Sequence, residues 1–252
     1  MKQNYGLQLY SVRDAAKVDF KKAVEDVAKI GYKYVEFAGF FDNSAEDVKA
    51  LLDNNGLICS GTHSPWTDLK PGAIMDTIKY HKTIGNPRYI IPGADLNTLE
   101  KIEEFVNVMN FAQPILAAEG IKLGYHNHSH EFIVMPWGST IHAELERRTN
   151  VEFEIDTFWA FNANLDPLAT LERLKNRMSV IHLKDGFKAN TPDFHGARGM
   201  ALGEGEAPVA QVRRKAIELG LTMVVESETC QPSGIEEVTR CFKYLEKLDA
   251  ED

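Results

Sequence analysis

The chain of 252 residues is poor in cysteine, in long apolar runs and in clustered positive charge. Its three cysteines, Cys59, Cys230 and Cys241, fit neither a disulfide framework nor a paired thiolate zinc motif, so we expect free thiols. No run of about 18 apolar residues is present, which excludes a membrane-spanning helix. The net charge is −9, and nucleic-acid binding depends on Lys and Arg neutralising phosphates. Small molecules, rather than nucleic acids or membranes, are therefore the expected partners.

The first twelve residues, MKQNYGLQLYSV, also lack the charged, apolar and small-residue order of a secretory signal. We therefore expect a cytoplasmic protein, and a periplasmic location stays open if a signal precedes this segment in the native chain. With 44% hydrophobic residues the sequence can bury the core of an ordinary globular protein. Whether it forms a homo-oligomer is left open.

Eight short strand-like runs alternate with amphipathic segments along the chain. The runs lie at 5–12, 33–39, 57–63, 88–94, 122–128, 151–160, 178–185 and 221–228. Helical spacing marks 19–32, 44–56, 97–120 and 233–248, with Ser44 as an N-cap, Gly31 and Gly56 as stops, and Pro114 expected to kink or break its helix. Eight strand-then-helix units without a dividing linker predict an α/β fold, a single (β/α)8 TIM barrel over residues 1–252. An open doubly wound sheet is disfavoured because no Gly-rich phosphate loop follows the first run.

Parity along the strands predicts a site at one end of this barrel. Alternate residues of a barrel strand face the interior, and those at the carboxyl ends form the active site. With the apolar residues of each run placed on the helix side, His126, His128, Asp156, His182 and Glu226 point inward at the same end. Each alone would more often be a satisfied core residue, but together they would bury several unneutralised charges. Carboxylate and imidazole ligands without thiolate predict one divalent ion, Mn, Mg, Co or Zn.

Further candidates for substrate contact lie outside these four runs. Glu36 should point inward, where a substrate contact and a structural ion pair are equally open, and His63 ends its strand where a loop begins. Aromatic residues expected near the mouth would suit the apolar face of a sugar, although core packing explains each one equally well: Tyr10, Phe40, Trp66, Phe158 and Trp159. The Gly-rich segment 187–208 is long for a compact domain, which makes His195 and Arg198 candidate lid residues.

The set of segments resembles a known family, the xylose-isomerase-like barrels of sugar phosphate isomerases and epimerases. The matching pieces, in order along nearly the whole chain, are LQLYSVRD, YVEFAG, YHNHSHEF, EIDTFWA, IHLKD, GEGEAP and VVESE. Each is a weak motif, but their order and spacing make the set specific. The resemblance implies a divalent metal held by a carboxylate from the run at 122–128 and by an Asp, a His and a Glu from the next three runs. Asp156, His182 and Glu226 match the last three.

The sequence departs from the family in the run at 122–128. The family's ketose epimerases carry a glutamate there that binds metal and moves a proton, whereas the inward position here is His126. We expect Glu131 to reach back as the fourth metal ligand, because a dication with only two carboxylates would be under-neutralised in a dry pocket. The alternative is that Glu131 contacts the substrate as a second carboxylate.

Such a site predicts a sugar isomerase or epimerase that abstracts the proton beside a carbonyl and forms an enediolate. Glu226 and Glu131 on opposite faces of the substrate would remove and return the proton. If His126 or His128 is the base instead, the alternative is a lyase, a dehydratase or eliminase of keto-sugars, keto-inositols or keto-glycosides. Lys184 is expected to hold an oxyanion or carboxylate. The expected substrate is an unphosphorylated sugar, because no phosphate cradle is visible.

Two other functional classes are weaker. A deoxyribonuclease resembling the family's repair endonucleases would need a cationic surface, which the negative charge disfavours. A non-catalytic sugar-binding barrel would keep the aromatic residues and loops, but it would not need a layer of metal ligands on four strands.

Overall fold

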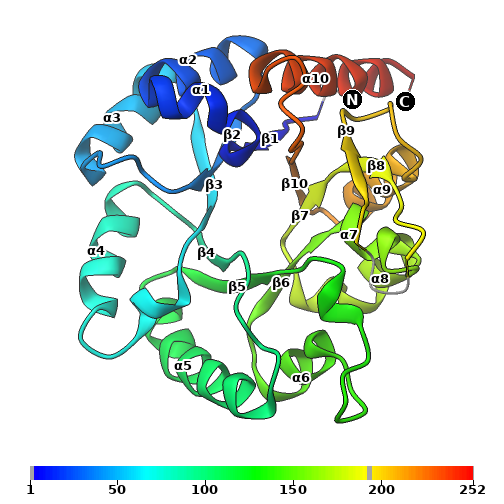
Figure 1. The fold of residues 1–252 in the computed structure, drawn as a ribbon. Coiled ribbons are helices and arrows are strands. Elements are labelled where there is room, and N and C mark those ends of the chain that lie inside the picture. Colours follow the sequence, from blue (N-terminus) through cyan, green and yellow to red (C-terminus); the bar gives the residue numbers. More distant parts are fainter. Residues whose placement is uncertain (1–2, 192–194, 252) are drawn as a thin grey trace.

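Eight parallel strands close into a barrel in the computed structural model, which describes residues 3–191 and 195–251. The strand order around the barrel is β1-β10-β7-β6-β5-β4-β3-β2 (Figure 1). The strands are β1 Gly6–Gln8, β2 Tyr34–Ala38, β3 Ile58–His63, β4 Arg88–Ile91, β5 Lys122–His126, β6 Glu152–Asp156, β7 Val180–Leu183 and β10 Thr222–Val225. The predicted (β/α)8 barrel is confirmed. Residues 1, 2, 192–194 and 252, which fall in the predicted amino-terminal segment, lid segment and domain end, lie outside the described residues.

Ten helices of the described chain surround the strands (Figure 1). They are α1 Arg13–Val18, α2 Phe20–Ile30, α3 Ala45–Asn55, α4 Ile74–Thr83, α5 Leu99–Ala118, α6 Ile141–Arg148, α7 Thr157–Asn162, α8 Pro167–Leu174, α9 Val209–Glu218 and α10 Gly234–Glu251. The predicted boundaries hold: the Ser44 side chain accepts the Asp47 N–H, and Gly56 ends α3 with φ of 62°. Pro114, in contrast, neither breaks nor ends α5, which continues through it. No helix of the described residues has both the length and the apolar composition to cross a membrane.

Two predicted strands end earlier than their apolar runs. β1 stops at Gln8, whose side-chain oxygen accepts the Tyr10 N–H and begins a 3-10 turn, Leu9–Val12. β6 stops at Asp156, whose carboxylate accepts the Trp159 N–H and caps α7. In both cases a polar side chain at the strand end satisfies a backbone N–H of the next turn, which sequence periodicity does not reveal. Trp159 therefore lies on a helix rather than on a strand.

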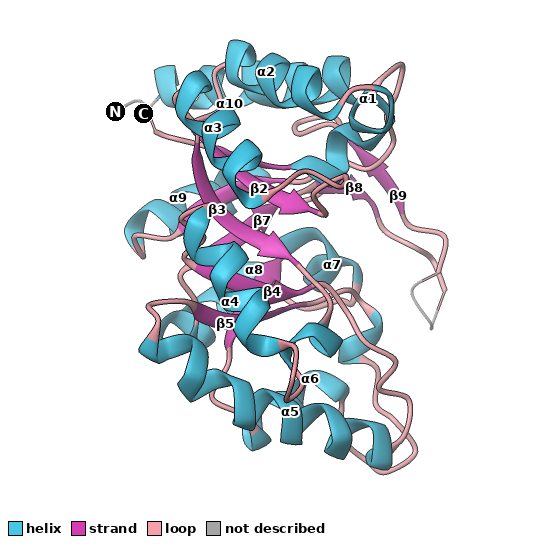
Figure 2. Ribbon diagram, turned by 90° about the vertical axis from the view of Figure 1, so that its left-hand side faces the viewer, coloured by secondary structure: helices cyan, strands magenta, loops and turns pink. Residues whose placement is uncertain are grey.

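The segment after β7 contains a short antiparallel pair rather than only a loop. β8, Asp185–Phe187, pairs with β9, Arg198–Met200, outside the barrel. In Figure 2 the arrowheads of β2 and β3 point toward the side of the molecule on which β8 and β9 extend. This is the end at which the carboxyl termini of the barrel strands meet.

The strand register fixes the level of the inward-facing residues. Asp156 is opposite His182 across β6 and β7, and His126 is opposite Glu154 across β5 and β6. Below them Ile90, Val180 and Val224 form a small apolar layer inside the barrel. The main core lies between the strands and the helices. The predicted parity is confirmed. It places the inward-facing acidic and histidine side chains above the apolar layer of Ile90, Val180 and Val224.

Candidate functional site

Four titratable side chains converge at the carboxyl end of the barrel. His126 ends β5, Asp156 ends β6, His182 lies on β7 and Glu226 follows β10, and all four are buried. One potential ligand atom from each lies within 4.8 Å of the others. We call these four residues the mouth cluster. Three of the ligands predicted from strand parity, Asp156, His182 and Glu226, thus lie together at the predicted end of the barrel.

The Asp156 carboxylate is only half satisfied. Its Oδ1 accepts the Trp159 N–H at 2.9 Å, while Oδ2 is buried and has no hydrogen-bond partner among the described residues. The Lys184 Nζ lies 3.9 Å from Oδ2. Burial raises the pKa of Asp156 to about 7. A buried carboxylate oxygen without a partner is costly, and a cation would satisfy it. Two carboxylates and two imidazoles also form a donor set that suits Mn, Mg, Co or Zn, so the residues fit a divalent ion.

Lys184 brings a positive charge to the mouth cluster. Its Nζ is buried, 3.2 Å from Oε2 of Glu226 and 2.7 Å from Oε1 of Glu228, and it lies 4.7 Å from the centre of the Trp159 ring. Burial alone would lower the pKa of Lys184, but the neighbouring carboxylates, Glu226 first, raise it. Burial would likewise raise the pKa of Glu226, but Lys184 and His182 hold it well below its usual range. The pair is therefore charged at neutral pH.

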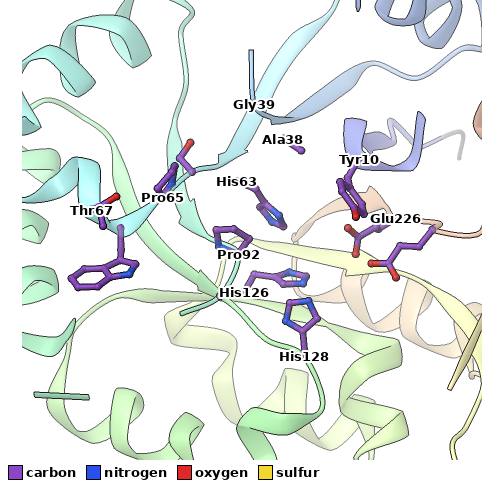
Figure 3. A pocket seen from close by; sticks show the side chains of 14 residues that line it. Tyr10, Ala38, Gly39, His63, Pro65, Thr67, Pro92, His126, His128 and Glu226 are labelled. Atoms are coloured by element: carbon purple, nitrogen blue, oxygen red, sulfur yellow. The ribbon is translucent and has the colours of Figure 1, made fainter. Parts of the chain in front are cut away.

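A cavity of about 660 Å³ opens above the mouth cluster (Figure 3). Figure 3 shows His63, His126, His128 and Glu226 directed into it. It is lined by Tyr10, Ala38, Gly39, His63, Ser64, Pro65, Trp66, Thr67, Pro92, Gly93, His126, His128, Glu226 and Glu228. The predicted contact residues Tyr10, His63 and Trp66 are thus among its walls.

A second cavity of about 280 Å³ adjoins the first and shares His128 with it. It contains two more of the predicted contact residues, Trp159 and His195. Burial is the main cause that lowers the pKa of His128, which leaves its imidazole neutral near pH 7. Arg198, the other candidate lid residue, lies on β9 and stacks over Phe187.

Comparison with known proteins decides the family. A family model described as xylose isomerase-like TIM barrel matches residues 24–245. The chain belongs to the xylose isomerase-like TIM barrel family. It is 26% identical over 237 residues to 2-oxo-tetronate isomerase of Haemophilus influenzae, with 84% of this chain and 88% of that protein covered.

Solved structures resemble the whole chain. One sugar phosphate isomerase/epimerase from Parabacteroides distasonis has a TM-score of 0.79 at 21% identity, covering 98% of both chains. A second from the same organism has a TM-score of 0.76 at 23% identity, covering 97% of this chain and 93% of the other. At these identities the likeness is one of fold.

Glu131, which the charge argument predicted as the fourth ligand, does not lie with Asp156, His182 and Glu226 but in a separate group of potential ligands with His128 and His130. Its carboxylate is buried and accepts the Tyr125 hydroxyl at 3.0 Å and the His128 N–H at 2.7 Å. Tyr125 faces away from the barrel interior, against Phe105 of α5. The 3-10 turn His130–Phe132 thus directs Glu131 toward the wall of the barrel, where it holds the loop after β5. His126, and not Glu131, is the β5 member of the mouth cluster.

Glu36 is also displaced from its predicted role. It points inward as predicted, but it is fully buried and is not part of the cavity lining in the described chain. Its Oε1 accepts the Gln8 Nε2–H at 2.7 Å and lies 2.8 Å from the His182 Nε2. Of the two predicted alternatives, the structure supports the ion pair and places Glu36 beneath the imidazoles.

Sequence reasoning missed two carboxylates at this site. Glu228 lines the cavity and binds Lys184. Its position two residues after Glu226 was the available signal, since that spacing keeps the same face. Glu154 lies two residues before Asp156 and so has the same inward parity; its Oε2 lies 2.7 Å from the His63 Nε2.

The GEGEAP segment of the family pattern is bound by an internal carboxylate. Asp185 accepts backbone N–H groups from Gly186, Gly203, Gly205 and Ala207 at distances between 2.8 and 3.0 Å. Clustered backbone N–H groups of this kind form anion sites. Here the anion is supplied by the chain itself.

Proposed function

We propose that the protein is a divalent-metal-dependent sugar isomerase or epimerase that abstracts a proton next to a carbonyl and passes through an enediolate. The observation that carries this proposal is the mouth cluster, of which His126 and Glu226 line the 660 Å³ cavity while Asp156, with a carboxylate oxygen that has no hydrogen-bond partner in the described chain, and His182 lie behind them. The similarity to 2-oxo-tetronate isomerase supports the reaction class. Function is argued from this site, because barrels of this fold support many chemistries.

His126, Asp156, His182 and Glu226 are the residues that would hold the ion. A divalent ion in such a site polarises a substrate carbonyl and acidifies the adjacent C–H. The remaining steps fall to side chains of the chain itself.

Two bases of different kind border the cavity. Glu226 follows β10 and His128 follows β5, and β7 and β6 separate these strands around the barrel. Glu226 is ionised and His128 is neutral, so either can accept a proton. A sugar between them can lose a proton to one of these groups, and the same group, now protonated, can return it to the other carbon of the enediolate, which gives isomerisation. Lys184 does not line the cavity, but as the protonated partner of Glu226 it supplies positive charge beside it, which stabilises the negative charge of the enediolate.

An unphosphorylated substrate fits the lining best. Among the described residues around the cavity there is no Lys or Arg, while Glu226 and Glu228 contribute negative charge. The backbone N–H cluster of Gly203, Gly205 and Ala207, which resembles an anion site, is filled by Asp185. A phosphate group would therefore meet carboxylates rather than the cations that bind it.

A lyase is the second candidate. The position of Glu131 favours it, because Glu131 does not face Glu226 across the substrate as the isomerase prediction required. With Glu131 turned to the wall, β5 contributes only imidazoles to the cavity. Where a single imidazole removes the proton and a leaving group lies β to the carbonyl, the enediolate expels that group. Keto-sugars, keto-inositols and keto-glycosides are the corresponding substrates.

Incubation of Mn-loaded protein with unphosphorylated 2-keto sugars and 2-keto sugar acids in deuterated water tests the proposal. We expect deuterium beside the carbonyl in a product of unchanged formula, and a loss of about 100-fold or more in His128→Asn if His128 moves the proton. His81→Asn is the matched control, because His81 is a buried imidazole of α4 bonded to Asn86, away from the cavity. Release of water or of an aglycone would show that the protein is a lyase and not an isomerase. If no deuterium exchange occurs with any of these substrates, both proposals are wrong.

A further inference from the structure

Three imidazoles pack against one another directly beneath the cavity. His63 ends β3, His126 ends β5 and His182 lies on β7. Their ring centres are 4.8 Å apart for His63 and His126, 5.2 Å for His63 and His182, and 4.7 Å for His126 and His182. Two of these rings belong to the mouth cluster. The triangle is therefore part of the support of the proposed cation site.

Two buried glutamates hold this triangle from below. Glu36 Oε1 lies 2.8 Å from the His182 Nε2 and 3.1 Å from the His63 Nε2. Glu154 Oε2 lies 2.7 Å from the His63 Nε2 and 3.3 Å from the His126 Nδ1. Both glutamate side chains are fully buried. Glu36 thus contacts His63 and His182, whereas Glu154 contacts His63, His126 and also His182, whose Nε2 lies 3.3 Å from its Oε2.

The contacts select one nitrogen on each ring of the mouth cluster. On His182 the Nε2 faces Glu36, and the Nδ1 is on the side of Glu226, 3.4 Å from its Oε2. On His126 the Nδ1 faces Glu154, which leaves Nε2 on the side of the cavity that His126 lines. The His126 contact falls within ion-pair distance but does not meet hydrogen-bond geometry with any described residue. The two rings therefore use different nitrogens: His182 turns Nε2 to its glutamate and leaves Nδ1, whereas His126 turns Nδ1 to its glutamate and leaves Nε2.

We propose that Glu36 and Glu154 are positioning residues that orient the two imidazole ligands, so that a divalent cation binds His182 through Nδ1 and His126 through Nε2. The inference rests on the cation site of the proposed function. Carboxylates behind ligating imidazoles fix the ring orientation and raise the basicity of the ligand nitrogen. Glu154 in particular places a carboxyl group behind His126, the β5 ligand, whose imidazole is uncharged.

The direct test is the affinity for Zn²⁺ and Mn²⁺ alone, measured by competition with a chromogenic chelator. We expect Glu36→Gln and Glu154→Gln to weaken binding of each ion by about 10- to 100-fold. Glu152→Gln is the matched control: Glu152 lies on the same strand as Glu154 but bonds Lys122 and Ser179, so its removal should change affinity by less than about 2-fold. Thermal unfolding of the metal-free variants separates a loss of affinity from a loss of fold.

A crystal structure of the Zn-loaded wild-type protein gives the second readout, which does not depend on any variant folding. Coordination through His182 Nδ1 and His126 Nε2 supports the inference, and coordination through His182 Nε2 overturns it. Wild-type affinity in both glutamine variants, with tight binding in the wild type, would also overturn it while leaving the proposed function intact. If the wild type binds neither ion, the proposed function fails and the inference with it.

Discussion

The carboxylates at the two ends of the barrel differ in burial and in pairing: Glu152 at the amino end is partly exposed, whereas those at the carboxyl end are buried. At the amino ends of the strands, Glu152 Oε1 lies 2.6 Å from the Lys122 Nζ and its Oε2 accepts the Ser179 hydroxyl at 2.5 Å. Arg88 donates there to Ser179 and to the Ser60 carbonyl. At the carboxyl ends, Glu36, Glu154 and Asp156 each have a buried oxygen without a hydrogen-bond partner in the described chain: Oε2, Oε1 and Oδ2 respectively.

β6 contains both situations within five residues. Glu152 begins the strand with both oxygens paired, and Asp156 ends it with one oxygen unpaired. The same parity points both inward, so the difference comes from their surroundings. A fully paired carboxylate can be explained by folding alone, whereas an unpaired one carries a cost that indicates a ligand. The comparison therefore separates a structural end of the barrel from a functional one.

The largest effect should follow from removing the unpaired carboxylate. We expect Asp156→Asn to lower the rate of proton exchange by about 1000-fold or more, because it removes one of the two negative ligands of the mouth cluster. The amide can still accept the Trp159 N–H, so the cap of α7 is retained. Steady-state kinetics with saturating Mn²⁺ measures the change. A rate within 10-fold of the wild type would remove Asp156 from the site.

A smaller effect concerns stability against pH in the metal-free protein. Burial raises the pKa of both Asp156 and Glu154 to about 7. The unfolded chain ionises these groups near their ordinary values of 3.8 and 4.5, so the native state binds more protons between about pH 4 and pH 7. These two carboxyl groups therefore lower the free energy of unfolding as the pH rises through that window, whereas the histidines whose pKa is lowered by burial contribute in the opposite direction: His81, His126, His128 and His142.

Denaturant unfolding at several pH values checks this dependence. The contributions of the histidines cancel in the difference in unfolding free energy between the wild type and Asp156→Asn. This difference should fall by up to about 1.4 kcal/mol per pH unit as the pH rises, the effect of one proton. A saturating divalent cation should have a greater stabilising effect at pH 7.5 than at pH 5.5, because protons compete for the same oxygens. A difference that does not change with pH would show that Asp156 has the same pKa in the native protein as in the unfolded chain.

The functional end of the barrel could be predicted from sequence where strand parity decides the direction of a side chain. Strict alternation on β6 and β7 placed Asp156 and His182 inward, and the regular count of eight runs predicted the closed barrel. Closure itself then brings together side chains that lie up to 100 residues apart. These features follow from the alternation of apolar and polar residues and from the repeat of strand and helix, both of which can be read in the sequence.

Residues beyond the last strand position could not be predicted in this way. Glu131 turns to the wall because Tyr125 and the His128 N–H offer it hydrogen bonds, and Trp159 lies on a helix because Asp156 caps it. Glu36 points inward as predicted but lies too deep to reach the cavity, because His63 and His182 cover it. The depth of a side chain below the cavity and its local hydrogen bonds produce no periodic pattern in the sequence, so they could not be predicted.

The smallest effect is expected at the paired end. Glu152→Gln should lower the free energy of unfolding by about 1 kcal/mol or less, because the Lys122 partner is half exposed and the amide can still accept the Ser179 hydroxyl. Activity should stay within about 2-fold of the wild type, since Glu152 bonds Lys122 and Ser179 and belongs neither to the mouth cluster nor to the lining of the 660 Å³ cavity. Chemical denaturation and kinetics on the same sample measure both. A large loss of activity at unchanged stability would mean that the two ends of the barrel are coupled, and the division between a structural and a functional end would then be wrong.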